Sequence, residues 1–329
     1  MVGLTHVALR LVVREFMPEQ AHTIWPTEML SSRRLKAENL DETNETKRGP
    51  DENDLVPQIL GNEEESIRLA IEKLAQWGAV GVDINMGCPV QKALKHNYGV
   101  ALMGDSDYAA EVVQMAVRNS LGLPISVKLR AGHQSNMDIL ISFAKKLEAA
   151  GASWLTLHPR TAEQKRRGQA DWSQIGLLKK ELRIPLIGNG DIQIADDVFQ
   201  MLQSTGCDMV MAGRALAARP WMVWQVGERL GFAPPSGFVG RAPATSDEEG
   251  QMYGYCLLKQ IHHCRNYFSE EQSLRKLRFY IRTTSVWLEF GHELIKLSTK
   301  LKTLDEVEKG IQDFFSRPQR MFPRTELRQ

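Results

Sequence analysis

The chain has 329 residues, and its 41 lysines and arginines nearly balance its 40 aspartates and glutamates, which leaves a formal net charge of +1. Hydrophobic residues make up 43% of the sequence, enough for a large core, so a disordered polyelectrolyte is excluded. No apolar run is long enough to cross a bilayer, and we expect no membrane partner. Because the net charge is close to zero, nucleic-acid binding would have to rely on local basic patches.

The four cysteines are Cys88, Cys207, Cys256 and Cys264. They show neither the paired spacing of a disulfide framework nor the spacing of zinc ligands, so we expect free thiols and no metal. The sequence opens without a secretory signal pattern. Together these features predict a reducing, cytoplasmic location, and we expect a monomer.

Short apolar runs alternate with amphipathic helical patterns along the first two thirds of the chain. The runs span residues 55–59, 80–84, 125–129, 154–157, 185–187 and 209–211. The helical patterns span residues 64–77, 107–119, 137–150, 172–182 and 195–204. This alternation predicts parallel βαβ units and an α/β fold, for which we favour a (β/α)₈ TIM-type barrel; an open doubly wound sheet would give the same pattern. Residues 36–54 lack apolar periodicity and predict a mobile loop.

Residues 83–89 read Asp-Ile-Asn-Met-Gly-Cys-Pro and place a cysteine on a tight turn directly after a strand. Gly87 and Pro89 restrict the backbone around Cys88, which would hold its thiol at the rim of the sheet. A thiol in that position can serve chemistry. The alternative is that Cys88 is an inert small hydrophobic residue.

Polar residues also follow the other apolar runs. They are Lys128 and Arg130, His158 and Arg160, Asn189-Gly190-Asp191, and Gly213-Arg214. In a barrel these residues would meet at the carboxyl ends of the strands, where active sites form. Glycines at two successive strand ends, with Arg214, favour a phosphate-bearing cofactor over ordinary turns. Lys128 could instead be an ion-pair partner, and His158 a packed histidine.

A Pro- and Gly-rich segment marks the best domain boundary. We predict a catalytic barrel over residues 1–230, a linker over 231–250, a helical domain over 251–316 and a basic tail over 317–329. After the linker, the helical pattern resumes near Met252. The helical domain carries Arg275, Lys276 and Arg278 among aromatic residues, which suits a phosphate-bearing partner or, alternatively, a solvated face. Arg160 and the basic residues 165–167 form a second patch near the expected mouth.

Several of these motifs together resemble the tRNA-dihydrouridine synthase family. They are Asn-Met-Gly-Cys-Pro at 85–89, Gly-Val-Ala-Leu-Met at 99–103, Val-Lys-Leu-Arg at 127–130, His-Pro-Arg-Thr at 158–161, Gly-Gln-Ala-Asp-Trp at 168–172, Ile-Gly-Asn-Gly-Asp at 187–191 and Gly-Arg at 213–214. Their order and spacing match the family from Met1 to about Trp221.

The resemblance implies an FMN-dependent oxidoreductase that reduces a specific uridine of tRNA to 5,6-dihydrouridine with NADPH. It implies that Cys88 protonates C5 of the base. It assigns cofactor binding to Met1, Gln58, Lys128, His158, Asn189, Gly190, Asp191, Gly213 and Arg214. It assigns substrate binding to Asn85, Arg130, Arg160, Arg275, Lys276 and Arg278.

The family begins with a strand that leads into an Ala-Pro-Met motif, and this sequence starts within that motif. We therefore expect the first barrel strand to be missing from this sequence. We favour the explanation that translation starts upstream, so that Met1 is an internal methionine. The alternative is a shortened form of the protein that retains flavin more weakly. Two other functions fit the residues: another TIM-barrel flavin oxidoreductase acting on a small molecule, and a catalytically impaired tRNA-binding protein.

Overall fold

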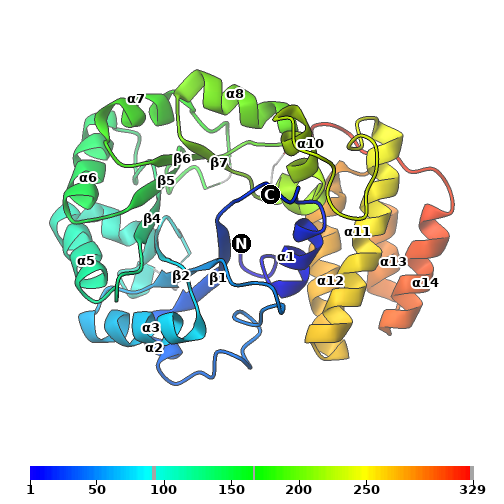
Figure 1. Ribbon diagram of the computed structural model, residues 1–329, viewed down its shortest axis with the longest axis horizontal. Coiled ribbons are helices and arrows are strands. Elements are labelled where there is room, and N and C mark those ends of the chain that lie inside the picture. The colour runs from blue at the N-terminus through cyan, green and yellow to red at the C-terminus, as the bar shows by residue number, and fades with distance from the viewer. Residues whose placement is uncertain (91–93, 166, 327–329) are drawn as a thin grey trace.

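The computed structural model describes residues 1–90, 94–165 and 167–326. Seven parallel strands pair in chain order to form one curved sheet with a TIM-barrel-like architecture (Figure 1). They are β1 (Trp25–Ser31), β2 (Leu55–Leu60), β3 (Val82–Met86), β4 (Ile125–Arg130), β5 (Trp154–His158), β6 (Leu186–Asn189) and β7 (Met209–Met211). Within the described residues no strand joins β7 to β1, so the predicted barrel that lacks one strand is confirmed.

Helices between the strands cover the outer face of the sheet (Figure 1). The longer ones are α3 (Glu64–Trp77), α5 (Ser106–Arg118), α6 (Met137–Ala149), α7 (Ser173–Glu181) and α8 (Ala195–Thr205). Shorter elements are α2 (Ser32–Leu35), the 3₁₀ helix η1 (Gly99–Gly104), α9 (Arg214–Ala218) and α10 (Met222–Arg229). The five predicted helices are confirmed to within a residue or two, because clear caps bound them: Asp105 caps α5, Asn136 caps α6, and Gly78 ends α3 in a left-handed conformation.

Strand β1 has no counterpart among the predicted apolar runs. Its sequence is Trp-Pro-Thr-Glu-Met-Leu-Ser, and Thr27 and Glu28 are buried although both are polar. Its pairing with β2 is irregular between Pro26 and Met29. Pro26 has no N–H to donate, and proline in a sheet is confined largely to edges, strand starts and bulges. A pattern search for apolar runs therefore misses this strand.

Residues 36–54 form a loop with neither helix nor strand, and contacts at Lys47 and Glu52 attach it to the barrel. The segment is fastened to α1 (Val7–Arg14) by a buried ion pair, in which Arg10 Nε donates to Glu52 Oε1 over 2.7 Å and Arg10 Nη2 to Glu52 Oε2 over 2.7 Å. Arg10 also donates to the carbonyl oxygen of Lys47 over 2.8 Å. A charge pair buried this well resists opening, because either partner alone would be left in a medium of low dielectric constant.

The chain continues into a bundle of helices beside the barrel, at the right of Figure 1. These are α11 (Ser246–Tyr267), α12 (Glu270–Thr284), the 3₁₀ helix η2 (Ser285–Trp287), α13 (Gly291–Lys300) and α14 (Leu304–Phe315). Helix α11 begins six residues before the expected Met252, because Thr245 and Glu248 form a capping box there. None of the described helices is long and apolar enough to cross a membrane.

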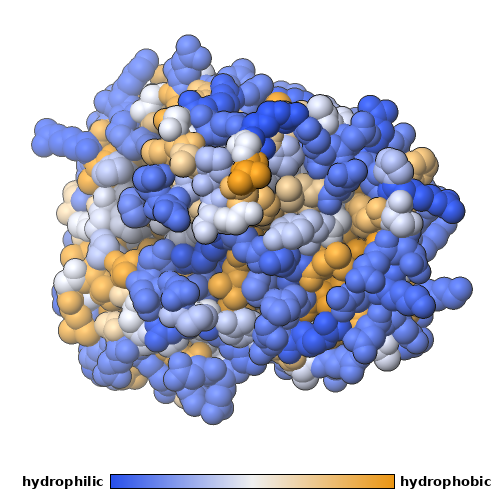
Figure 2. Space-filling model, turned by 45° about the vertical axis from the view of Figure 1, so that its right-hand side comes forward, coloured by the Kyte–Doolittle hydropathy of each residue, from blue (hydrophilic) through white to orange (hydrophobic). Residues whose placement is uncertain are grey.

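The helix bundle packs on the barrel through α1, which lies against α11. Glu15, directly after α1, accepts a hydrogen bond of 2.9 Å from the Tyr255 hydroxyl and lies 3.2 Å from the Lys259 ammonium nitrogen. With the bundle brought forward, the surface is largely hydrophilic, with hydrophobic residues gathered in separate patches (Figure 2). Contacts of α1 and Glu15 thus hold the bundle against the amino-terminal part of the chain.

Candidate active site at the carboxyl ends of the strands

The side chains that point into the barrel form successive rungs, because neighbouring parallel strands are in register. Gln58 pairs with Asp83, and Asp83 with Ser126, across β2, β3 and β4. Two residues further along, Asn85 pairs with Lys128; Arg130 then pairs with His158 at the carboxyl ends of β4 and β5. Alternation along each strand therefore stacks polar residues on the inner face and brings them to one rim.

Cys88 lies on a turn directly after β3 and is held through its backbone. Asn85 Oδ1 accepts hydrogen bonds from the N–H groups of Gly87, over 3.1 Å, and Cys88, over 2.9 Å. Arg130 Nε donates to the carbonyl oxygen of Gly87 over 2.9 Å. Residue 99 has φ +61°, and a Cβ there would lie 2.5 Å from the Cys88 carbonyl oxygen, so only glycine fits.

The Asn85 side chain is itself oriented by a row of buried polar groups. Its Nδ2 donates to Gln58 Oε1 over 2.7 Å, and Gln58 Nε2 donates to Asp83 Oδ2 over 2.7 Å. The Ser126 hydroxyl donates to the other Asp83 oxygen over 2.6 Å. Burial raises the pKa of Asp83, and the bonds from Ser126 and Gln58 together with the Lys128 charge oppose that rise.

Lys128 lies on the same inner face and joins β4 to β6. Its Nζ donates to Asn189 Oδ1 over 3.2 Å, and Asn189 Nδ2 donates to the Met211 carbonyl oxygen over 2.7 Å. Burial lowers the pKa of Lys128 to about 8, while Asp83 raises it and Arg130 lowers it further. Near neutral pH the ammonium is thus charged but close to its point of deprotonation.

His158, at the end of β5, is neutral. Burial lowers its pKa to about 2, and the positive charges of Lys128, Arg130, Arg160 and Arg214 act in the same direction. Residue 190 has φ +117°, and a Cβ there would lie 2.9 Å from His158 Cδ2. Gly190 is therefore required for the close approach of the β6 loop to the imidazole ring.

Arg160 is only 3% exposed and is engaged inside the protein. Its Nη2 donates to both carboxylate oxygens of Asp191, over 2.7 and 2.8 Å, and its Nη1 lies 3.1 Å from His158 Nε2. Asp191 also accepts a hydrogen bond of 2.7 Å from the backbone N–H of Ala170. These contacts fasten the loop after β5 to the loop after β6. Residue 166 of the predicted basic patch lies outside the described residues.

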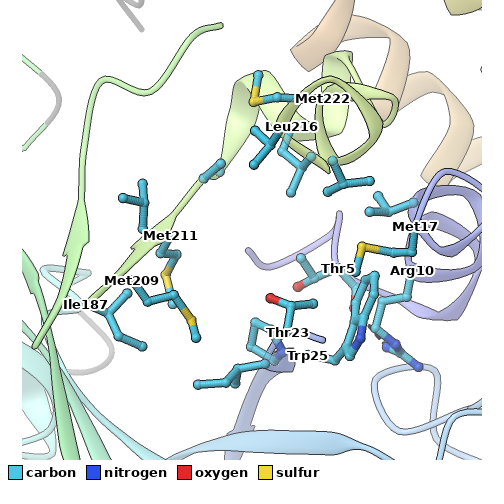
Figure 3. A pocket seen from close by; sticks show the side chains of 18 of the residues that line it. Thr5, Arg10, Met17, Thr23, Trp25, Ile187, Met209, Met211, Leu216 and Met222 are labelled. Atoms are coloured by element: carbon cyan, nitrogen blue, oxygen red, sulfur yellow. Dashed lines mark hydrogen bonds between the residues drawn. The ribbon is translucent and has the colours of Figure 1, made fainter. Parts of the chain in front are cut away.

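A cavity of about 480 Å³ opens where β1 and β7 do not pair. It reaches Gln58, Asp83 and Ser126 on the inner face of the sheet, while Cys88, Lys128 and His158 are not among the residues that line it. Methionines and other apolar side chains line it, among them Met17, Met209, Met211 and Met222 (Figure 3). Gly213 borders the cavity, and a Cβ at that position would meet only Met1 Sδ, at 3.6 Å. The loop that carries Gly213 and Arg214 thus leaves room for a group placed against its backbone.

The three cations predicted on the helix bundle have different surroundings. Lys276 is 9% exposed, and its Nζ lies 4.5 Å from the ring centroid of Phe268. Arg278 donates to the carbonyl oxygens of Ser298, over 3.0 Å, and Leu301, over 2.7 Å. Arg275 is exposed, as is Arg282 two turns further along α12. Helical spacing identified the cluster but not which of its members face inward.

The rim combines a cysteine on a rigid turn, a buried ammonium group and a neutral imidazole, and the row of Gln58, Asp83 and Ser126 connects it to the cavity. Ammonium and guanidinium donors suit an anionic cofactor. Sequence reasoning assigned no role to Asp83 or Ser126, although their spacing of two residues from Asn85 and Lys128 places them on the same inner face. The fold and the site together define a TIM-barrel-type protein with polar groups gathered at the carboxyl ends of its strands.

Comparison with known proteins identifies the family. The dihydrouridine synthase family model matches residues 1–309. A probable tRNA-dihydrouridine synthase of Mycobacterium leprae is 30% identical over 94% of this chain and 85% of its own length. One of Mycobacterium tuberculosis is 31% identical over 94% of this chain and 79% of its own. The tRNA-dihydrouridine synthase B of Xanthomonas campestris is 36% identical over 54% of this chain and 55% of its own. The chain belongs to the dihydrouridine synthase family.

The lowered pKa of Lys128 predicts a specific dependence of stability on pH. Between a pKa of about 8 in the folded chain and the ordinary 10.5, the unfolded chain binds more protons, so stability rises with pH in that window. Lys128→Met removes this dependence. From pH 7 to pH 10, the unfolding free energy of the wild type should therefore rise by about 2.5 kcal/mol relative to that of the variant.

Urea denaturation of both chains at the two pH values measures this difference. Lys145→Met, which removes a half-exposed lysine on α6, is the matched control and should show little change relative to wild type. A constant difference between wild type and Lys128→Met across the range would contradict the assignment of a depressed pKa to Lys128.

Proposed function

We propose that this protein reduces a specific uridine of tRNA to 5,6-dihydrouridine, with FMN as cofactor and NADPH as electron donor. The observation that carries the proposal is the placement of Cys88, Lys128 and His158 around one rim in a member of the dihydrouridine synthase family. The relatives in Mycobacterium and Xanthomonas bear the name tRNA-dihydrouridine synthase. Cys88, on its fixed turn, supplies the acid that such a reduction needs.

The residues of the rim fit an anionic flavin. Lys128 and His158 would face the flavin ring, and Gln58 and Met1 would border it. The loops that carry Asn189, Gly190, Gly213 and Arg214 would hold the phosphate, since glycines let the backbone approach and Arg214 adds positive charge. Asp191 would act through Arg160, whose guanidinium it binds. Bound FMN, once reduced by NADPH, would supply hydride to C6 of the uracil ring.

The chain's own groups complete the reduction. As hydride reaches C6, negative charge develops toward C5 and O4, and C5 must gain a proton from the opposite face. The Cys88 thiol donates that proton, so that the C5–C6 double bond becomes a single bond. The Lys128 ammonium group, in surroundings of low dielectric constant, stabilises negative charge on the cofactor. Neutral His158 can form hydrogen bonds without adding charge.

We propose two side chains beside the Cys88 turn, Asn85 and Arg130, as contacts to the substrate base. One N–H of Asn85 is directed at the sulfur of Met29, over 3.2 Å, and thioether sulfur is a weak acceptor. That N–H is the group we assign to the uracil edge. Arg130, whose Nε donates to the Gly87 carbonyl oxygen, is the second substrate contact that we propose at this turn. Because the target base is stacked in folded tRNA, it must be extruded to enter the site.

For the tRNA body we propose the exposed face of α12, with Arg275 and Arg282 as phosphate contacts. Phe279 lies between them on the helix and is 41% exposed. Its ring packs against Gly3, whose loop begins at Met1 beside Gly213, so this face adjoins the end of β7. The internal contacts of Lys276 and Arg278 assign those two residues to holding α12 in place.

The test of the proposed reaction is the dihydrouridine content of tRNA that lacks this modification, after incubation with the protein, FMN and NADPH. Nucleoside mass spectrometry should detect dihydrouridine with the wild-type chain. Cys88→Ala should lower turnover by about 100-fold or more, the usual contribution of a general acid, while flavin and tRNA binding persist.

Cys207→Ala is the matched control, because Cys207 is equally buried but lies in the core. It should retain turnover. Full activity of Cys88→Ala would remove Cys88 as the proton donor, and no product from the wild type would remove the proposed reaction.

The α12 face is tested separately by the double variant Arg275→Gln, Arg282→Gln. Loss of two phosphate contacts should weaken tRNA binding and lower the slope of log Kd against log salt concentration by about 2, because fewer counterions are released. FMN content should not change. Arg265→Gln, which neutralises an exposed arginine on α11 that pairs with Asp305 and Glu308, is the control. An unchanged salt slope in the double variant would place the tRNA elsewhere.

A further inference from the structure

Asp83 is a buried carboxylate that the proposed reaction leaves without a role. It lies on β3 inside the barrel and is 8% exposed. Its oxygens accept hydrogen bonds from the Ser126 hydroxyl and from Gln58 Nε2. Burying a carboxylate costs free energy, so two strong hydrogen bonds here keep the group in place without explaining why it is there.

A series of hydrogen bonds runs from Asp83 through Gln58 and Asn85 to the Cys88 turn, and each donor and acceptor in it is fixed. A carboxylate can only accept, so Gln58 must present its NH₂ group to Asp83 and its carbonyl oxygen to Asn85. Asn85 must then donate its own NH₂ group to Gln58, which leaves its carbonyl oxygen for the turn. The distances along this path are 2.7 Å from Gln58 to Asp83 and 2.7 Å from Asn85 to Gln58.

The other end of the path imposes the same direction. The backbone N–H groups of Gly87 and Cys88 can only donate, so the Asn85 oxygen must face them. Both ends therefore agree on one orientation of the two amides. If either amide rotated by 180°, two NH₂ groups or two oxygens would face each other in a buried place, at a cost of an unmade hydrogen bond for each.

We propose that Asp83 is a positioning residue, which fixes the Cys88 turn by setting the orientation of the Gln58 and Asn85 amides in series. The catalytic consequence rests on the proposed function, because it takes Cys88 as the proton donor. The structural consequence does not: it concerns only how tightly the turn is held. Ser126 binds the opposite oxygen of the same carboxylate and lies outside the path.

Hydrogen exchange of the Cys88 amide measures this constraint directly. Selective ¹⁵N labelling of cysteine gives one amide signal for each of the four cysteines, and Cys88→Ser assigns the signal of interest. In Asp83→Leu, which has similar size but no acceptor, exchange at Cys88 should be faster by about tenfold, the effect of weakening one buried hydrogen bond. In Asp83→Asn, whose oxygen can still accept from Gln58, exchange should stay close to wild type.

Ser126→Ala is the matched control, because it removes a hydrogen bond from the same carboxylate without interrupting the path. Its Cys88 exchange should match that of the wild type. Equal exchange in wild type and Asp83→Leu would overturn the proposal, and so would Asp83→Asn behaving like Asp83→Leu. If Asp83→Leu does not fold, Gln58→Leu interrupts the same path at its middle and should accelerate exchange equally; unchanged exchange there would also overturn it.

Kinetics separate this proposal from the proposed function. With the wild type active, Asp83→Leu should lower kcat by between about tenfold and 100-fold, the cost of a slightly misplaced catalytic group, with KM for tRNA little changed. Asp83→Asn should recover most of that loss. A wild type that makes no dihydrouridine would refute the proposed function alone, whereas unchanged exchange in an active enzyme would refute only the role of Asp83.

Discussion

The site depends on one geometric constraint, the in-register pairing of parallel strands whose side chains alternate between the two faces of the sheet. Because β2, β3 and β4 pair as they do, Gln58, Asp83 and Ser126 share one rung. The next rungs carry the groups that meet at the rim. A shift of one residue in any strand would turn its polar residues to the outer face, beneath the helices. Register thus decides whether the cysteine turn and the ammonium group meet.

Burial of these polar groups costs stability, and the pKa shifts show where. Burial raises the pKa of Asp83 and lowers that of Lys128 to about 8, although the two charges favour one another. Placing these two ionisable groups in the interior therefore costs folding free energy, which apolar side chains in the same positions would not cost. Such a cost is typical of functional sites, where charge placement matters more than stability. The same low dielectric constant that imposes the cost strengthens any electrostatic interaction with a bound cofactor.

Much of this arrangement could be predicted from the sequence, since helix caps and short apolar runs are local signals. Strand β1 could not, because Thr27 and Glu28 interrupt its apolar pattern and are buried by tertiary contacts. The surroundings of Lys276 and Arg278 also depend on contacts with residues outside α12, namely Phe268 and Ser298. Asp83 was visible in the cysteine motif, but its role appears only when Gln58, from another strand, lies beside it. Local sequence patterns do not show which residues from different strands and helices will contact one another.

We propose that the strand ends form a site for a flavin that carries phosphate. The most direct test compares binding of FMN and riboflavin by quenching of flavin fluorescence. Since only FMN can use the glycine loops and the charge of Arg214, it should bind at least about tenfold more tightly, the effect of charge-assisted hydrogen bonds. The difference should shrink in Arg214→Gln. Equal affinity for the two flavins, or binding of neither, would contradict the assignment of this site.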